Sequence, residues 1–168
     1  MPVSHHEGKA WLEAHYSIAR PARVVDVGAG EGIYSMRMRP YHRAYWTAIE
    51  AWEPYVERFA LPSKYDEIVV GDIRSIELPP ADLYIAGDVL EHMSRPEAIE
   101  VIRRMQAVAR HVFVSVPIIE IHQGAVHGNP YEAHEHHWTF EEMHEVLDHC
   151  PAWLGEVIGA FHWTRGDE

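Results

Sequence analysis

Cysteine is almost absent from this sequence, basic residues are few, and no long apolar run occurs. Cys150 is the only cysteine in 168 residues, so an intrachain disulfide is excluded and a reducing compartment is favoured. No stretch approaches the roughly 20 apolar residues of a membrane-spanning helix. The first residues also lack the basic and apolar regions of a secretory signal. We therefore expect a cytoplasmic protein that does not enter a membrane.

The shortage of positive charge restricts the partners that the chain can bind. There are 14 Lys and Arg residues against 26 Asp and Glu residues, which gives a formal net charge of −12 at pH 7. Affinity for nucleic acids depends on basic surface that displaces counterions. We therefore expect small neutral or cationic molecules as partners and no nucleic acid.

No internal repeat, low-complexity run or linker rich in Pro, Gly or Ser divides the chain. Apolar residues make up 47% of the sequence and charged residues 24%, as in ordinary globular proteins. A chain of this length is about the size of one domain. We predict a single domain over residues 1–168.

Short apolar runs rich in β-branched residues alternate with segments of helical pattern. Two capping-box sequences, at 94–97 and 139–142, each open a helix, and a leading helix is expected within residues 1–20. The alternation predicts an α/β fold with a Rossmann-like, doubly wound, mainly parallel sheet. Strands are predicted at 23–27, 44–49, 67–70, 82–86 and 112–116, with a last strand within 154–163. Helices are predicted at 5–19, 53–60, 94–109 and 139–149.

The tail after the last predicted helix is short. It has room for one strand, so we expect a minimal form of the fold with a shortened C-terminal strand pair. A sheet edge left uncovered in this way is available for pairing with another chain. A homodimer through that edge is the corresponding prediction.

Three glycines follow the first predicted strand in the segment VVDVGAGEG, residues 24–32. Glycine permits positive φ and lets a ligand lie against bare backbone. In an open parallel sheet, a turn of this kind lies at the carboxyl edge, where ligands bind. The alternative is a tight strand-to-helix turn that binds nothing.

A dinucleotide site would require the pattern G-x-G-x-x-G. Gly28 and Gly30 fit that pattern, but Ile33 stands where the third glycine is needed for close packing of helix and strand. Asp26 is also unexpected beside a pyrophosphate, whereas a carboxylate suits a cofactor that carries an amine or another cation. The turn therefore favours S-adenosylmethionine over NAD.

The segment VVDVGAGEG resembles motif I of the class I S-adenosylmethionine-dependent methyltransferases, in particular small bacterial and phage members. AIEAWEP, VVGDI, DLYIAGDVLEHM and HVFVSVPI follow in the order of that family, and the resemblance extends from residue 22 to about residue 145. It implies that Glu50 binds the ribose hydroxyls and that the strand ending near Asp88 runs under the methionine part of the cofactor. Ala51 and Trp52 would flank the adenine. The implied cofactor-binding residues are Asp26, Gly28, Gly30, Glu50, Ala51, Trp52, Asp72, Ile73 and Asp88.

The residues themselves agree in part with this assignment. Glu50 follows Gly28 by 22 residues, about the interval that brings a carboxylate of the second strand beside the first turn. The alternative for Glu50 is a solvated strand end. The resemblance places Asp72 and Ile73 beside the adenine amino group. The alternative for Asp72 is a simple turn former, because Gly71 precedes it.

Carboxylates and imidazoles gather at two points of the sequence, after the fourth strand and after the fifth. The pattern D-x-x-E-H at 88–92 resembles the E-x-x-E-H of metal-assisted O-methyltransferases, in which a later histidine before an aromatic segment completes the site. This resemblance implies a divalent-metal site, although Asp88 is shorter than the glutamate of those families. A metal-free general base at His92 or His137 and purely structural histidines are the alternatives. The candidate metal ligands are Asp88, Glu91, His92 and His134.

The loop at 118–138 is long enough to be a lid over the active site. Asn129 and Tyr131 are its predicted substrate contacts, together with His137. His5 and the other scattered histidines receive no function. The predicted activity is methyl transfer from S-adenosylmethionine to an oxygen or nitrogen of a small molecule. The alternatives are a non-catalytic binding or regulatory subunit, and metal-assisted O-methylation of a nucleic-acid or quinone-like hydroxyl.

Overall fold

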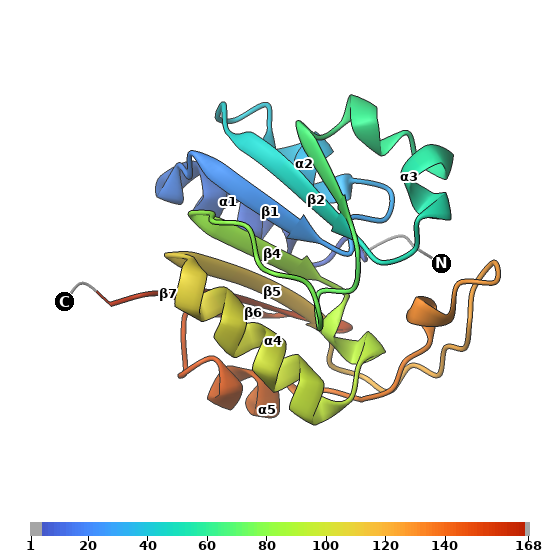
Figure 1. Ribbon diagram of the computed structural model, residues 1–168. Helices are drawn as coiled ribbons and strands as arrows, with labels where there is room; N and C mark the ends of the chain where they lie inside the picture. Colours follow the sequence, from blue (N-terminus) through green and yellow to red (C-terminus); the bar gives the residue numbers. More distant parts are fainter. Residues whose placement is uncertain (1–4, 167–168) are drawn as a thin grey trace.

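A computed structural model describes residues 5–166 and contains one seven-stranded sheet (Figure 1). The strand order is β3-β2-β1-β4-β5-β7-β6, and the first five strands pair in parallel. The predicted Rossmann-like, mainly parallel fold is confirmed. The strands are β1 (Arg23–Val27), β2 (Tyr45–Glu50), β3 (Glu67–Val70), β4 (Leu83–Gly87), β5 (His111–Pro117), β6 (Ala152–Leu154) and β7 (Ile158–Thr164).

Helices cover both faces of the sheet. Figure 1 shows α4 and α5 on one side and α1 and α2 on the other, and each side has its own buried apolar cluster. The described helices are α1 (Lys9–Ala19), α2 (Ile33–Met38), α3 (Pro54–Arg58), α4 (Arg95–Val108) and α5 (Phe140–Val146), with the 3-10 turns η1 (Leu61–Ser63), η2 (Leu90–His92) and η3 (Pro130–Glu132). None of the helices in the described part of the chain is long and apolar enough to cross a membrane.

Alternation along β1 divides its side chains between the two faces. Val25 and Val27 pack in the cluster under α4, whereas Val24 packs in the cluster under α1 and α2. All five residues of β4 are buried, as expected for a strand that is covered on both sides. The carboxyl ends of β1, β2, β3, β4 and β5 therefore meet at one edge of the sheet.

The C-terminal tail contains two strands, and the prediction of room for one was wrong. β7 lies antiparallel between β5 and β6. A loop of only three residues, 155–157, reverses the chain, and it is closed by a hydrogen bond of 2.9 Å from the amide of Gly155 to the carbonyl of Ile158. The pair is shortened only at β6, which has three residues.

The other boundaries lie close to their predicted positions. Ser94 and Glu97 form the predicted capping box at the start of α4, and the hydroxyl of Thr139 accepts a hydrogen bond from the amide of Glu142 at the start of α5. α5 ends at Val146, before the predicted end at His149. Residues 1–4 of the predicted leading segment, and residues 167–168 of the predicted domain, lie outside the described residues.

Candidate active site

A cavity of about 360 Å³ opens at the carboxyl edge of the sheet. Its walls come from the glycine turn after β1, the end of β2, the turn after β3, the segment after β4 and the long loop after β5. Ligands of open α/β sheets bind at this edge. The cavity therefore lies where the sequence places the active site.

The glycine turn presents bare backbone to this cavity. Gly28 has a φ of 62°, and a Cβ placed on it would lie 2.6 Å from a methyl group of Val89. The amide of Gly28 donates to the carbonyl of Ile49 at 2.8 Å, which fixes the turn against the end of β2. A side chain at residue 28 would be strained and would also displace Val89, so the position requires glycine.

Glu50 links the glycine turn to the end of β2. One carboxylate oxygen accepts a hydrogen bond from the amide of Gly30 at 3.1 Å, and the other accepts one from the amide of Trp52 at 2.9 Å. The side chain is 5% exposed and lines the cavity. Burial raises the pKa of Glu50, and the two backbone hydrogen bonds act against this rise. Each carboxylate oxygen keeps a lone pair that can accept a hydrogen bond from a ligand.

Of the four remaining residues predicted near the adenine, three line the cavity and one supports a lining residue. Ala51, Asp72 and Ile73 line the cavity, whereas Trp52 supports Glu50 through its backbone amide. Both carboxylate oxygens of Asp72 accept hydrogen bonds from the guanidinium of Arg74. Partial burial acts to raise the pKa of Asp72, but the hydrogen bonds from Arg74 outweigh it and lower the pKa.

Asp26 does not line the cavity, which departs from its predicted contact with the cofactor. Because side chains alternate along a strand, Val27 faces the cavity and Asp26 points to the opposite face of the sheet. There its carboxylate accepts a hydrogen bond of 2.5 Å from the hydroxyl of Tyr65. Burial raises the pKa of Asp26 to about 7. Asp26 is thus a buried support behind the glycine turn.

Asp88 lies at the end of β4 and lines the cavity. It is a non-glycine residue with a positive φ of 57°, a conformation that costs energy and is often found at functional sites. One carboxylate oxygen accepts from the amide of His5 at 3.0 Å, and the other accepts from the hydroxyl of Ser115 at 3.2 Å. The side chain is held in one orientation from two sides.

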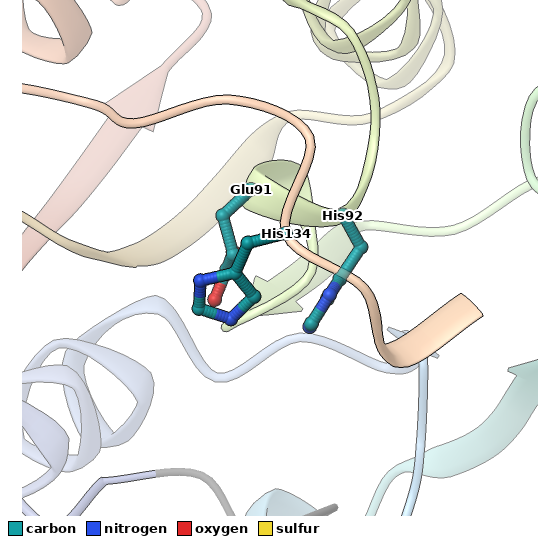
Figure 2. Close-up of side chains that lie close together, drawn as sticks. All are labelled: Glu91, His92 and His134. Carbon is teal, nitrogen blue, oxygen red and sulfur yellow. The ribbon is translucent and has the colours of Figure 1, made fainter. Parts of the chain in front are cut away.

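Three other side chains bring potential metal-ligating atoms together beside Asp88. Figure 2 shows Glu91 and His92, both from η2, and His134, from the long loop, pointing into a common space. One ligand atom of each residue lies within 4.8 Å of the other two. Asp88 does not belong to this group, and its role as a metal ligand stays a prediction. Its shorter side chain is occupied by His5 and Ser115 instead.

The protons of the two histidines can be placed from their partners. Nδ1 of His92 lies 3.2 Å from the carbonyl of Ala133, and Nδ1 of His134 lies 2.8 Å from the carbonyl of Ile121. A carbonyl oxygen only accepts, so in each ring Nδ1 carries the proton and Nε2 keeps its lone pair. Burial, and then the neighbouring His134, lower the pKa of His92 to about 4. His92 is therefore neutral at pH 7.

Glu91 completes the group with an unsatisfied oxygen. Its side chain is 2% exposed, and Oε2 has no hydrogen-bond partner among the described residues. Burial raises the pKa of Glu91, and the charge of Asp88 raises it further. A buried carboxylate oxygen without a partner is costly. It is typical of a site in which a proton, a cation or a substrate donor is to be received.

The sequence matches the methyltransferase domain family over residues 25–111, just over half of the chain. The chain belongs to this methyltransferase family. The predicted membership of the class I S-adenosylmethionine-dependent methyltransferases is thereby confirmed. No curated protein matches the sequence.

Solved structures of methyltransferases share the fold of this chain at low sequence identity. Human N-acetylserotonin methyltransferase with bound S-adenosylmethionine superposes with a TM-score of 0.71 at 16% identity, over 96% of this chain and 52% of that chain. Magnesium protoporphyrin IX methyltransferase of Synechocystis PCC 6803 also gives 0.71 at 16% identity, over 94% and 80%. The 1,6-didemethyltoxoflavin N1-methyltransferase of Burkholderia thailandensis gives 0.69 at 19% identity, over 96% and 78%. The chain thus spans about half the length of some of these structures and about four fifths of others.

The three predicted loop contacts lie in different surroundings. Tyr131 lines the main cavity. His137 lines a smaller neighbouring cavity of about 200 Å³, which shares Glu91 and His134 with the main one. Asn129 lines neither of the two. It is 2% exposed, and its side chain accepts a hydrogen bond from the amide of Tyr131 at the start of η3. In the structure Asn129 caps η3, and its contact with a substrate stays a prediction.

Several residues that line or lie beside the main cavity were not predicted from the sequence. His5 lines it, although it belonged to the histidines without a function, and so do Gln123 and Glu132 of the long loop. Lys9 is also buried beside the site, at 2% exposure. Only Lys9 had a signal, since a lysine on the apolar side of an amphipathic helix is unusual. The other three are placed by the path of loops.

Proposed function

We propose that this methyltransferase binds S-adenosylmethionine in the main cavity and transfers its methyl group to a small-molecule acceptor. The observation that carries the proposal is Glu50, a buried carboxylate that lines the cavity and is fixed by the glycine turn and by Trp52. The bare backbone at Gly28, where a Cβ would clash, leaves room for a ligand at the same edge. These features fit a ligand with ribose hydroxyls.

Each lining residue has a role in this proposal. Glu50 accepts hydrogen bonds from the ribose hydroxyls, and Ala51 and Ile73 give apolar contact to the adenine. Asp88 faces the methionine part, whose ammonium and sulfonium are cationic. The cofactor supplies an electrophilic methyl group when it is bound. The protein contributes orientation and the exclusion of water, which are its main means of accelerating such a transfer.

The chemistry of the acceptor side favours a neutral or cationic small molecule. Glu91 and Glu132 line this side. The guanidinium of Arg74, which also lines the cavity, is bound to Asp72. Few groups therefore offer a positive charge to a carboxylate or phosphate of an acceptor. The neighbours named above are called methyltransferases of small molecules, which supports the same substrate class.

Calorimetry with S-adenosylhomocysteine tests the cofactor. We expect saturable binding and a rise in melting temperature, because a ligand of the folded state stabilises it by mass action. NAD is the control and is expected to do neither. Binding of NAD without binding of S-adenosylhomocysteine would overturn the proposal. Methyl transfer to any acceptor then separates an enzyme from a non-catalytic subunit with the same cavity.

We also propose a divalent cation at Glu91, His92 and His134. In each histidine Nδ1 lies within hydrogen-bond distance of a backbone carbonyl, which is the usual arrangement of the second ring nitrogen of a metal-ligating histidine. The unpartnered Oε2 of Glu91 supplies a carboxylate ligand. Imidazole and carboxylate together suit Zn²⁺, Mn²⁺, Fe²⁺ or Ni²⁺. A cation here would polarise an acceptor hydroxyl, which favours O-methylation.

Titration of the metal-free protein with Zn²⁺ and Mn²⁺ tests this second proposal. We expect one bound ion per chain, and we expect His92→Ala to weaken binding by at least about tenfold. His127→Ala is the matched control, because His127 is an exposed histidine away from both cavities. If the wild-type protein takes up no metal, or if both variants lose it equally, the cation site is removed from the proposal. A metal-free base at His92 or His137 and purely structural histidines are then the remaining alternatives.

The other predictions about partners remain predictions. A homodimer through β6 would use the exposed edge at Leu154, which is 60% exposed. A cytoplasmic location and the exclusion of nucleic acid rest on composition and charge. The role of residues 118–138 as a lid rests on the five residues of this loop that line the main cavity.

A further inference from the structure

The segment before α1 lies against the cavity and is fastened at two points. The amide of His5 donates to Asp88 at 3.0 Å, and His5 itself lines the cavity. Oε2 of Glu7 accepts hydrogen bonds from the amides of Val157 and Ile158 at 2.9 and 3.0 Å. Residues 5–7 therefore connect the carboxylate at the end of β4 to the start of β7.

Lys9 follows this segment and points into the protein. Lysine is rarely this deeply buried unless its ammonium has partners. Its Nζ lies 3.3 Å from the hydroxyl of Tyr34 and 4.5 Å from the centre of that ring. Burial lowers the pKa of Lys9, and the negative charge of Asp88 acts in the opposite direction. Lys9 and Asp88 thus influence each other electrostatically.

Two hydroxyls connect the lysine to the carboxylate. The hydroxyl of Tyr34 lies 2.9 Å from that of Ser115, which lies 3.2 Å from Oδ1 of Asp88. Tyr34 and Ser115 are both buried, at 4% and 1% exposure. The result is a chain of hydrogen bonds that runs from α1, through α2 and β5, to the cavity.

The direction of this chain is fixed by its two ends. An ammonium has only donors and an ionised carboxylate has only acceptors. Lys9 therefore donates to Tyr34, Tyr34 donates to Ser115, and Ser115 donates to Asp88. Hydrogen bonds that point the same way strengthen one another in a buried environment. Lys9 thereby polarises the Tyr34 and Ser115 hydroxyls and strengthens the hydrogen bond that Oδ1 of Asp88 accepts.

Gly87 makes room for this chain. A Cβ at Gly87 would lie 2.1 to 2.5 Å from the ring and the hydroxyl of Tyr34. The tyrosine therefore packs directly on the backbone that leads into Asp88. This close approach places the Tyr34 hydroxyl within reach of Ser115, and it accounts for a glycine at the last residue of β4.

We propose that Lys9 is a positioning residue, which orients Asp88 through Tyr34 and Ser115 to receive the cationic methionine part of the cofactor. The inference rests on the proposed cofactor site. Lys9 does not line the cavity, so its action is indirect. The amide of His5 holds the second oxygen of the same carboxylate. Residues 5–9 therefore act on both oxygens of Asp88, directly through His5 and indirectly through Lys9.

A double-mutant cycle with S-adenosylhomocysteine affinity as the readout tests this relay. We expect Lys9→Met to raise the Kd roughly tenfold, and Asp88→Asn to raise it as well. In the Asp88→Asn background, Lys9→Met is expected to add less than about twofold, because the carboxylate on which it acts is gone. The unliganded melting temperature of Lys9→Met is expected to stay the same or rise, since a buried charge is removed.

Tyr34→Phe tests the relay without removing a charge. It deletes the connecting hydroxyl and keeps the ring, so we expect the same direction of change in Kd. Tyr16→Phe is the matched control, because the buried Tyr16 donates to the carbonyl of His42 outside the relay. Equal Kd values for wild type and Tyr34→Phe, or additive effects of Lys9→Met and Asp88→Asn, would overturn the relay alone. A wild-type protein that does not bind S-adenosylhomocysteine would overturn the proposed function and the relay with it.

Discussion

The two sides of the main cavity differ in how their carboxylates are satisfied. On the cofactor side, each oxygen of Glu50 accepts a backbone hydrogen bond. On the acceptor side, Glu91 is equally buried and its Oε2 has no partner among the described residues. The carboxylate on the cofactor side thus has its hydrogen-bond partners within the protein. The carboxylate on the acceptor side leaves one oxygen for a ligand, a proton or a cation.

The difference follows from the elements that build each side. The glycine turn and Glu50 follow the ends of β1 and β2, which pair in parallel along all of β1. The acceptor side combines a 3-10 turn at Leu90–His92 with a long loop that reaches His134. Backbone pairing fixes the geometry at the ends of regular strands. Loops have no such pairing, and they contribute to a site through the side chains that they carry into it.

The largest expected effect concerns the cofactor side. Glu50→Ala is expected to weaken the binding of S-adenosylhomocysteine by about 1.5–3 kcal/mol, the range for hydrogen bonds to a charged group. Titration calorimetry measures the change. Glu53→Ala is the control, because Glu53 is an exposed carboxylate at the start of α3. An unchanged affinity in Glu50→Ala would mean that the cofactor side is not defined by this carboxylate.

A second prediction asks whether Asp26 supports the cofactor side from behind. The pKa of Asp26 is about 7 in the folded protein, against an ordinary value of 3.8. Between these values the folded state keeps a proton that the unfolded state releases, so Asp26 makes stability fall as pH rises, by up to about 1.4 kcal/mol per pH unit. The stabilisation by protonated Asp26 is fully present below the ordinary pKa of 3.8 and is lost as the pH rises through about 7.

Urea unfolding of wild type and Asp26→Asn, at about pH 5 and about pH 7.5, measures this dependence. The variant is expected to lose that part of the decline, while its affinity for S-adenosylhomocysteine changes by less than about twofold. The comparison with wild type is needed because His162, whose pKa is lowered to about 4 by burial, contributes the opposite trend. A large loss of affinity in Asp26→Asn would place its carboxylate in the cofactor contact after all.

The smallest expected effect concerns the acceptor side. Asn129→Ala removes the side-chain cap of η3 and is expected to lower stability by about 1 kcal/mol. The affinity for S-adenosylhomocysteine should not change, because Asn129 lies outside the cavity. Chemical denaturation and calorimetry measure the two quantities. A variant of full stability that loses acceptor binding would restore Asn129 as a substrate contact.

The fold and the cofactor side were largely predictable from the sequence. Alternating apolar runs determine the parallel sheet, and its carboxyl edge then gathers the glycine turn, Glu50 and Asp72 by topology alone. The orientation of single side chains was less accessible. Asp26 was expected at the cofactor, but one position of strand alternation turns it to the opposite face.

On the acceptor side, the sequence predicted that ligand-type residues would gather, but not which of their side chains would face one another. The pattern at 88–92 and the later histidines indicated a group of ligands, and three of the four candidates do meet. Asp88 instead accepts hydrogen bonds from His5 and Ser115, which belong to segments far away in the sequence. No local rule predicts such contacts, and the same holds for Lys9 with Tyr34.

The bonds of Glu7 to the amides of Val157 and Ile158 have a consequence for biogenesis. They join positions 150 and 151 residues apart, and contacts of such sequence separation form late and slow folding. While the chain is being translated, His5 can meet Asp88 early, but the hydrogen bonds of Glu7 cannot form until residues 157 and 158 have left the ribosome. Until β7 has paired with β5, that edge of the sheet is uncovered, and an unpaired strand edge makes a folding chain prone to aggregation.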